Sequence, residues 1–347
     1  MKSVYKNITL LLITLSLIVL IDRILLNYFG LPLWEWDEKL HYKHRHNSVK
    51  HWESFGNKPI VINEYGLHDD SFPIKKRKKE LRILNLGDSI TMGHGVTKDE
   101  TYSKFLELIL SDSLREYEII QAINTVVQGY STFQELEVLN RSLKFDPDIV
   151  TIGFCLNDAT EPFVVNKELG GIGLDYHRVT QAPNKLLSFF LNETGFGRLV
   201  QEIRIRKLDA NQMKIAELYD VKKMITKQVD STYQSQWNFT LAELNKIYTV
   251  CKMKDIPVVL LIFPFTFQLN NADMQWPQEL LKQDAIKNQV KYIDFIKTFE
   301  DIIDNDTTKI AKYFLDEDHY TVEGHKVVAQ ELGRVLVKIS ISNSYNN

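Results

Sequence analysis

Five short apolar runs in the chain predict buried strands. They are LRILNL (81–86), EIIQAIN (118–124), DIVTIGF (148–154), IPVVLLIF (256–263) and KYIDF (291–295). Continuous apolar runs of this length are typical of parallel strands that are covered on both faces. Helical patterns separate them, at 102–114, 132–143, 237–253, 277–289 and 322–339. The alternation predicts an α/β fold built on a doubly wound, five-stranded parallel sheet.

The first 30 residues predict a signal anchor. Lys2 and Lys6 precede the uncharged stretch 7–21, which ends at Asp22 and Arg23. The stretch is shorter than the roughly 20 residues of a full span, but the flanking cations can snorkel. A cleaved signal peptide is the alternative, and it is disfavoured because no Ala-x-Ala pattern follows. The lysines predict a cytoplasmic N-terminus and an extracytoplasmic catalytic domain.

Residues 31–80 predict a connecting arm between this anchor and a domain at 81–340. The arm carries four of the nine histidines, His41, His44, His46 and His51. A metal site is one interpretation, but no carboxylate or Cys ligand stands at ordered spacing, so a solvated loop is favoured. Within the domain, residues 159–236 break the strand–helix rhythm and predict an insertion, because they are too long for a simple connection.

Composition narrows the function classes. The chain has 347 residues, of which 44% are hydrophobic and 25% charged, as in globular proteins. A net charge of -3 gives no nucleic-acid footprint, and behind an anchor the basic run at 75–79 is interpreted as linker. Two cysteines exclude a disulfide scaffold and a Cys-rich zinc site.

Polar residues follow the predicted strands where this kind of sheet binds ligands. Ser89 comes after the first strand, Gly129 after the second and Asn157 after the third. Asp316 and His319 lie near the C-terminus, in the segment LDEDHYTVEGH. Because ligands bind beyond the carboxyl ends of parallel strands, we expect these residues to form one site.

The five residue types together predict acyl chemistry. A serine hydroxyl needs a base, and His319 can take its proton while Asp316 fixes the imidazole. Backbone N–H groups of Ser89 and Gly129, with the Asn157 side-chain amide, would stabilise an oxyanion. This chemistry requires no metal and no cofactor.

The motifs resemble those of the SGNH hydrolases, also called GDSL esterases and lipases, over residues 60–340. GDSIT resembles the nucleophile block, NTVVQG the glycine block, the Asn157–Asp158 pair the third block and DEDH the Asp-x-x-His block. The lead-in INEYGLHDD is similar to a membrane-anchored bacterial branch. The resemblance implies a flavodoxin-like, three-layer α/β/α fold. It also implies a Ser89–His319–Asp316 triad and oxyanion donors from Gly129 and Asn157.

Two positions depart from the family pattern, Cys155 before the Asn-Asp pair and Val126 in the second block. They bear on the shape of the pocket more than on activity. Asp318 also adjoins His319, although the three-residue spacing favours Asp316 as the orienting acid. His94 is expected either to line the pocket or to lie on the surface.

Three functions stay open. The first is an esterase acting on O-acyl groups of envelope glycans or lipids. The second is an acyltransferase that uses the same triad on a sugar hydroxyl. The third is a catalytically silent, membrane-tethered binding protein, because a fold does not secure a function. The expected partners are an acyl-ester substrate and the membrane; the acyl group, the alcohol and the oligomeric state stay open.

Overall fold

The computed structural model describes residues 2–51, 58–159, 185–205, 221–222, 224–225 and 231–344. The chain divides into two compact units. Unit 1 comprises Met1–Arg45 and Val164–Met213, and unit 2 comprises His46–Phe163 and Lys214–Asn347. Each is described by itself.

Unit 2 is built on the five-stranded sheet that the sequence predicts. Its strands are β5 (Glu80–Gly87), β6 (Ile119–Asn124), β7 (Ile149–Phe154), β8 (Val258–Ile262) and β9 (Lys291–Asp294). Their order is β6-β5-β7-β8-β9, and every neighbouring pair is parallel. In this order the chain reverses direction across the sheet beside β5, and ligands bind at such switch points.

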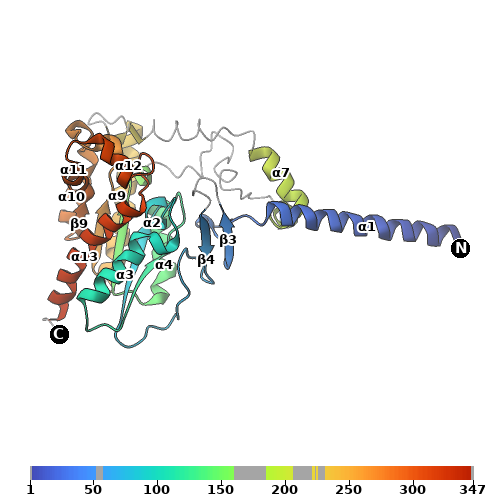
Figure 1. Cartoon of the computed structure of the whole chain (residues 1–347), viewed down its shortest axis with the longest axis horizontal. Helices are drawn as coiled ribbons and strands as arrows, with labels where there is room; N and C mark the ends of the chain where they lie inside the picture. The colour runs from blue at the N-terminus through green and yellow to red at the C-terminus, as the bar shows by residue number, and fades with distance from the viewer. Residues whose placement is uncertain are drawn as a thin grey trace. The chain divides into compact units, whose positions relative to one another are not determined.

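Helices flank the sheet, as the doubly wound pattern predicts (Figure 1). They are α2 (Ser89–Met92), α3 (Tyr102–Ser113), α4 (Thr132–Ser142), α9 (Ser231–Lys252), α10 (Trp276–Lys287), α11 (Phe295–Ile303), α12 (Ile310–Tyr313) and α13 (Val322–Ser344). α3 packs against α13, and α4 packs against α9. β5, β7 and β8 are buried along their whole length, which explains why apolar residues are frequent in their sequences.

The segment expected to be an arm contains strands. In unit 1, β1 (Trp34–Asp37) pairs with β2 (His41–His44), and in unit 2, β3 (Ser48–His51) pairs with β4 (Pro59–Ile62). Both pairs are antiparallel. Strands of four residues carry little periodic signal, so the sequence pattern does not reveal them.

The described residues of unit 1 also form the helices α1 (Lys2–Phe29), α6 (Lys185–Glu193) and α7 (Gly195–Ile205). Most of the predicted insertion at 159–236 lies outside the described residues; α6, α7, residues 221–222 and 224–225, and the start of α9 are the parts described. In α1, Ser3–Phe29 is long and apolar enough to cross a membrane, with a mean hydropathy of 2.4 over an 18-residue window. The helix continues through Asp22 and Arg23.

Gly87 makes the turn from β5 into α2 possible. Its φ of +146° is one that residues with a Cβ rarely adopt. A Cβ there would also collide with the Thr91 side chain and lie 2.9 Å from the carbonyl oxygen of Gly153 in the neighbouring strand. The end of β5 therefore requires glycine.

We expect Gly87→Ala to lower the free energy of unfolding by about 2 kcal/mol, because both the φ angle and the contacts oppose a side chain. Urea unfolding of the full chain in detergent, followed by tryptophan fluorescence, measures the effect. Ser111→Ala, at an exposed position of α3, is the control. Equal stability of the two variants would contradict the prediction.

Candidate active site

Ser89 begins the short helix α2 directly beyond the end of β5. The preceding Asp88 caps that helix, because its Oδ1 accepts a hydrogen bond of 3.0 Å from the Ile90 N–H. Gly93, with a φ of 92°, ends the helix after a single turn. The Ser89 side chain is therefore held at the carboxyl end of the sheet by a capped turn on one side and a strand on the other.

The residues before the sheet brace this turn. The Nδ1 of His68 donates to the carbonyl oxygen of Met92 at 3.0 Å, and the Asn124 side chain donates to that of Thr91 at 2.8 Å. Asp69 accepts a hydrogen bond of 3.0 Å from the Asn124 N–H and an ion pair of 2.8 Å from Lys104. The lead-in INEYGLHDD thus fixes the back of the nucleophile turn.

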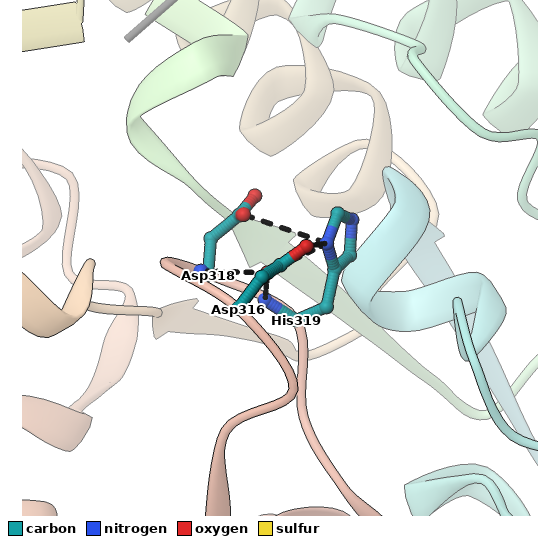
Figure 2. Close-up of side chains that lie close together, drawn as sticks. All are labelled: Asp316, Asp318 and His319. Carbon is teal, nitrogen blue, oxygen red and sulfur yellow. Dashed lines mark hydrogen bonds and ion pairs between the residues drawn. The ribbon is translucent and has the colours of Figure 1, made fainter. Parts of the chain in front are cut away.

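Ser89, His319 and Asp316 form one chain of hydrogen bonds. The Nε2 of His319 lies 2.8 Å from the Oγ of Ser89. Its Nδ1 lies 2.9 Å and 3.0 Å from the two carboxylate oxygens of Asp316 (Figure 2). Because a carboxylate only accepts, Nδ1 carries a proton, and in a neutral ring Nε2 is then the acceptor that faces Ser89.

The loop that carries Asp316 and His319 is closed on itself. Phe314 and Tyr320 form an isolated antiparallel bridge, and the Leu315 N–H donates to the His319 carbonyl at 2.8 Å. The Asp316 Oδ1 also accepts the backbone N–H groups of Asp318 at 3.1 Å and of His319 at 2.9 Å. The same carboxylate therefore shapes the loop and orients the imidazole.

Aromatic packing attaches this loop to the sheet. Tyr320 is fully buried, and its ring lies 5.2 Å from that of Phe299 in α11 and 5.7 Å from that of Phe263 beyond β8. The Thr266 N–H donates to the carbonyl of Glu317 at 2.7 Å. His319 is thereby delivered to Ser89 from a distant part of the chain.

The carboxylates of Asp318 and Asp316 raise the pKa of His319. Burial alone would lower its pKa, but the charges of Asp318 and Asp316 outweigh burial and raise the pKa to about 9. Asp318 Oδ1 lies 3.5 Å from Nδ1, farther than either oxygen of Asp316 (Figure 2). Burial would raise the pKa of Asp316, yet its hydrogen bonds and the charge of His319 hold that pKa well below its usual range. At neutral pH the pair is an imidazolium beside a carboxylate.

Asn157 joins the group through Asp88. Its Nδ2 donates to the Oδ2 of Asp88 at 3.0 Å, and the Ser89 hydroxyl lies 3.3 Å from the same oxygen. Asp88 is completely buried, and burial raises its pKa against the hydrogen bonds from Asn157 and Ile90. Asp88 is a site residue that the sequence reasoning missed, although its place between the strand and Ser89 is that of an N-cap.

Gly129 lies in the loop between β6 and α4, with a φ of 75°. The Tyr130 N–H closes a turn there on the Val127 carbonyl at 3.2 Å. Gly129 shares the carboxyl end of the sheet with Ser89 because β6 is parallel to β5. Its positive φ explains why glycine stands at this position.

Three further residues, His325, His94 and Cys155, lie near the site. His325 accepts a hydrogen bond of 3.2 Å from the Tyr102 N–H, and burial lowers its pKa to about 3, so it links α13 to α3. The ring of His94 lies 4.2 Å from that of His319 at 30°, which places it in the site. Cys155 is buried, and burial beside acidic groups raises the pKa of its thiol, so it is an uncharged side chain.

Asp316, Asp318 and His319 could also hold a metal ion, since their ligand atoms lie within 4.8 Å of one another. Among the described residues, this is the one cluster of His, Cys, Asp or Glu that meets that criterion. An ion would compete for Nδ1 with the hydrogen bond to Asp316. The four arm histidines do not form such a cluster in the described part of the chain.

The chain is similar to known esterases in sequence motifs and in fold. Residues 86–327 match the GDSL-like lipase/acylhydrolase family model. No curated protein matches the chain. Among solved structures it is similar to Axe2, an acetylxylan esterase from Geobacillus stearothermophilus, with 15% identity, a TM-score of 0.43, and coverage of 73% of this chain and 93% of that one.

A second similar structure is the acetyl xylan esterase AlAXEase, at 15% identity and a TM-score of 0.44, covering 74% of this chain and 99% of that one. A third is BT4096, described as a gut microbial diltiazem-metabolizing enzyme, at 12% identity and a TM-score of 0.43, covering 74% and 46%. The family match spans most of unit 2, from the end of β5 to the start of α13. The chain therefore belongs to the GDSL-like lipase/acylhydrolase family of SGNH hydrolases, and it is an ester-hydrolysing enzyme.

Proposed function

We propose that the enzyme hydrolyses O-acyl esters with Ser89 as nucleophile, His319 as base and Asp316 as the acid that orients it. The observation that carries the proposal is the unbroken hydrogen-bond chain from the Ser89 Oγ through both nitrogens of His319 to Asp316. A hydroxyl hydrogen-bonded to an oriented imidazole is the arrangement that activates serine.

In the first half-reaction the neutral His319 takes the hydroxyl proton while the Ser89 Oγ bonds to the ester carbonyl carbon. The tetrahedral intermediate collapses, and the alcohol leaves with the proton that His319 returns. In the second half-reaction His319 takes a proton from water, whose oxygen bonds to the acyl carbon. His319 then returns that proton to the Ser89 Oγ as the bond between Oγ and the acyl carbon breaks, which releases the acid. Asp316 keeps the Nδ1 proton and stabilises each transient imidazolium.

We assign the oxyanion to the N–H groups of Ser89 and Gly129 and to the side-chain amide of Asn157. An amide has two N–H donors, and one of those on Asn157 bonds to Asp88. That bond fixes the plane of the amide, and the second donor is the one we assign to the oxyanion. Asp88 therefore acts as a positioning residue.

We also propose that α1 anchors the enzyme and that unit 2 lies on the extracytoplasmic side. Support comes from the apolar length of α1 and from Lys2 and Lys6 at its start. On that side, O-acyl groups of envelope glycans or lipids are the substrates within reach. Transfer of the acyl group to a sugar hydroxyl would use the same residues, so assays should measure both free acid and acylated glycan.

We expect Ser89→Ala to abolish covalent labelling by a fluorophosphonate and to lower kcat on a short-chain aryl ester by about 10⁴-fold or more, because the attacking oxygen is lost. In-gel fluorescence and a chromogenic assay of the full chain in detergent measure the two effects. Ser113→Ala, at an exposed serine of α3, is the control. Retained activity in Ser89→Ala would refute Ser89 as the nucleophile.

The ionisation of His319 predicts an alkaline activity profile. The base must be neutral, so kcat/KM should rise with pH toward a midpoint near 9, its raised pKa. Asp318→Asn removes one carboxylate and should move the midpoint down by about one pH unit. Asp112→Asn, at an exposed position on α3, should leave it unchanged. A midpoint near 6.5 in the wild type would argue against this electrostatic account.

A topology reporter tests the proposed location. Alkaline phosphatase fused after Asn347 should be active in bacterial cells if unit 2 is extracytoplasmic. Replacing Lys2 and Lys6 by glutamate should reduce that activity, because it removes the positive charge that orients α1. Fluorescence of a green fluorescent protein fused at the same position, in place of the phosphatase, would place unit 2 in the cytoplasm.

A further inference from the structure

The helices α6 and α7 in unit 1 expose large apolar side chains. Leu186 is 83% exposed and Phe189 61% exposed in the nine residues of α6. On α7, Val200 and Ile203 are 42% and 53% exposed, one turn apart on the same face. Soluble proteins rarely gather so many apolar side chains on one short pair of helices.

Three polar side chains of the same two helices are buried. Arg198 is completely buried, and Gln201 and Asn192 are almost so. They form a network in which Arg198 donates to Gln201, and Gln201 donates to Asn192 at 3.0 Å. Exposed apolar side chains beside three buried, hydrogen-bonded polar side chains suit contact with lipid better than contact with water.

The helix pair is attached to the last turns of α1. One stripe of α1 is half-buried, formed by Asp22, Leu25, Leu26 and Phe29, while its earlier turns are exposed. Gly195 lies so close to this stripe that a Cβ would meet the Leu26 nitrogen at 2.6 Å. Small residues at helix contacts are typical of association inside membranes.

Polar groups at this contact bond to one another. The Asp22 carboxylate, which interrupts the apolar sequence of α1, accepts a hydrogen bond of 3.1 Å from the Phe196 N–H in the first turn of α7. Arg198 Nε donates at 3.1 Å to the carbonyl of Gly30, just after α1 ends. The anion thus faces a helix N-terminus, and the cation faces a helix C-terminus.

We propose that α6 and α7 lie in the interfacial layer of the bilayer, with their exposed apolar side chains in lipid beside the end of α1. This rests on the proposed function only in that α1 is taken to span the membrane. The uncharged stretch 7–21 would cover about 22 Å, less than the roughly 30 Å of a hydrocarbon core. The start of α7 meets α1 at Asp22, where that stretch ends, so the exposed apolar side chains of α6 and α7 would extend the lipid contact of α1.

Lipid contact can be measured residue by residue in the full chain. Single cysteines at Leu186, Phe189 and Ile203 are labelled with bimane, and the protein is reconstituted in phosphatidylcholine–phosphatidylglycerol vesicles. The native Cys155 and Cys251 are buried, so the introduced thiol takes the label. Some vesicles carry a nitroxide near the head group, others one near the end of the acyl chain.

We expect the three labels to be quenched several-fold more by the shallow nitroxide than a label at Leu108, an equally apolar and exposed residue of α3 in unit 2. A label at Leu17 in the middle of α1 should be quenched most by the deep nitroxide. If Leu17 is quenched but the other three behave like Leu108, α6 and α7 face water or another protein, and the inference is wrong. If Leu17 is not quenched either, the anchor itself fails, and the inference fails with it.

Discussion

The hydrogen bond between Ser89 and His319 joins residues that are 230 positions apart, and the rest of unit 2 is arranged to keep it. Ser89 is fixed by the strand β5 and the capped turn of α2. His319 is fixed by a loop that must return to the same edge of the sheet after four further strands. Parallel strands bring their carboxyl ends together. The bridge from Phe314 to Tyr320, the aromatic contacts of Tyr320 and the hydrogen bonds of Asp316 then fix the imidazole to within hydrogen-bond distance. The sheet brings the two segments to the same edge, and the aromatic packing helps to fix the distance between their side chains.

Buried carboxyl groups give this site an unusual charge balance. Asp88 lies beneath Ser89, and burial raises the pKa of Asp158 and Glu135, which lie close enough to influence each other. Asp88, together with Asp316 and Asp318, favours a positive charge on His319. The same field that stabilises the imidazolium in the transition state keeps it protonated at rest. The carboxylates therefore stabilise the imidazolium that forms during the reaction. They also reduce the fraction of enzyme in which His319 is neutral near pH 7 and able to act as a base.

The sequence predicts the sheet well because its strands β5, β7 and β8 are buried along their whole length and are rich in apolar residues. It predicts Ser89 because its motif follows the first strand, and Asp316 and His319 because of the motif DEDH near the C-terminus, and the structure brings these three together. Asp88 was missed, since its role depends on a partner, Asn157, that is 69 positions away. The hairpins before the sheet were missed as well, because four-residue strands have too few positions to establish a period. Local patterns thus reveal elements and motifs, while contacts between residues far apart in the sequence become visible only once the strands are paired.

Asp22 illustrates how the meaning of one residue depends on its surroundings. In the sequence it interrupts an apolar stretch and weakens the expectation of a membrane span. In unit 1 its carboxylate meets the first turn of α7, so the interruption is the point at which a second helix joins α1. The burial of Arg198 and the exposure of Phe189 follow the same logic, since both are unfavourable in water and both are favourable at a lipid interface. Unit 2 buries most of its large apolar side chains, as proteins in water do, whereas α6 and α7 of unit 1 expose several of theirs. The two units are therefore suited to different solvents, water for unit 2 and the proposed lipid interface for unit 1.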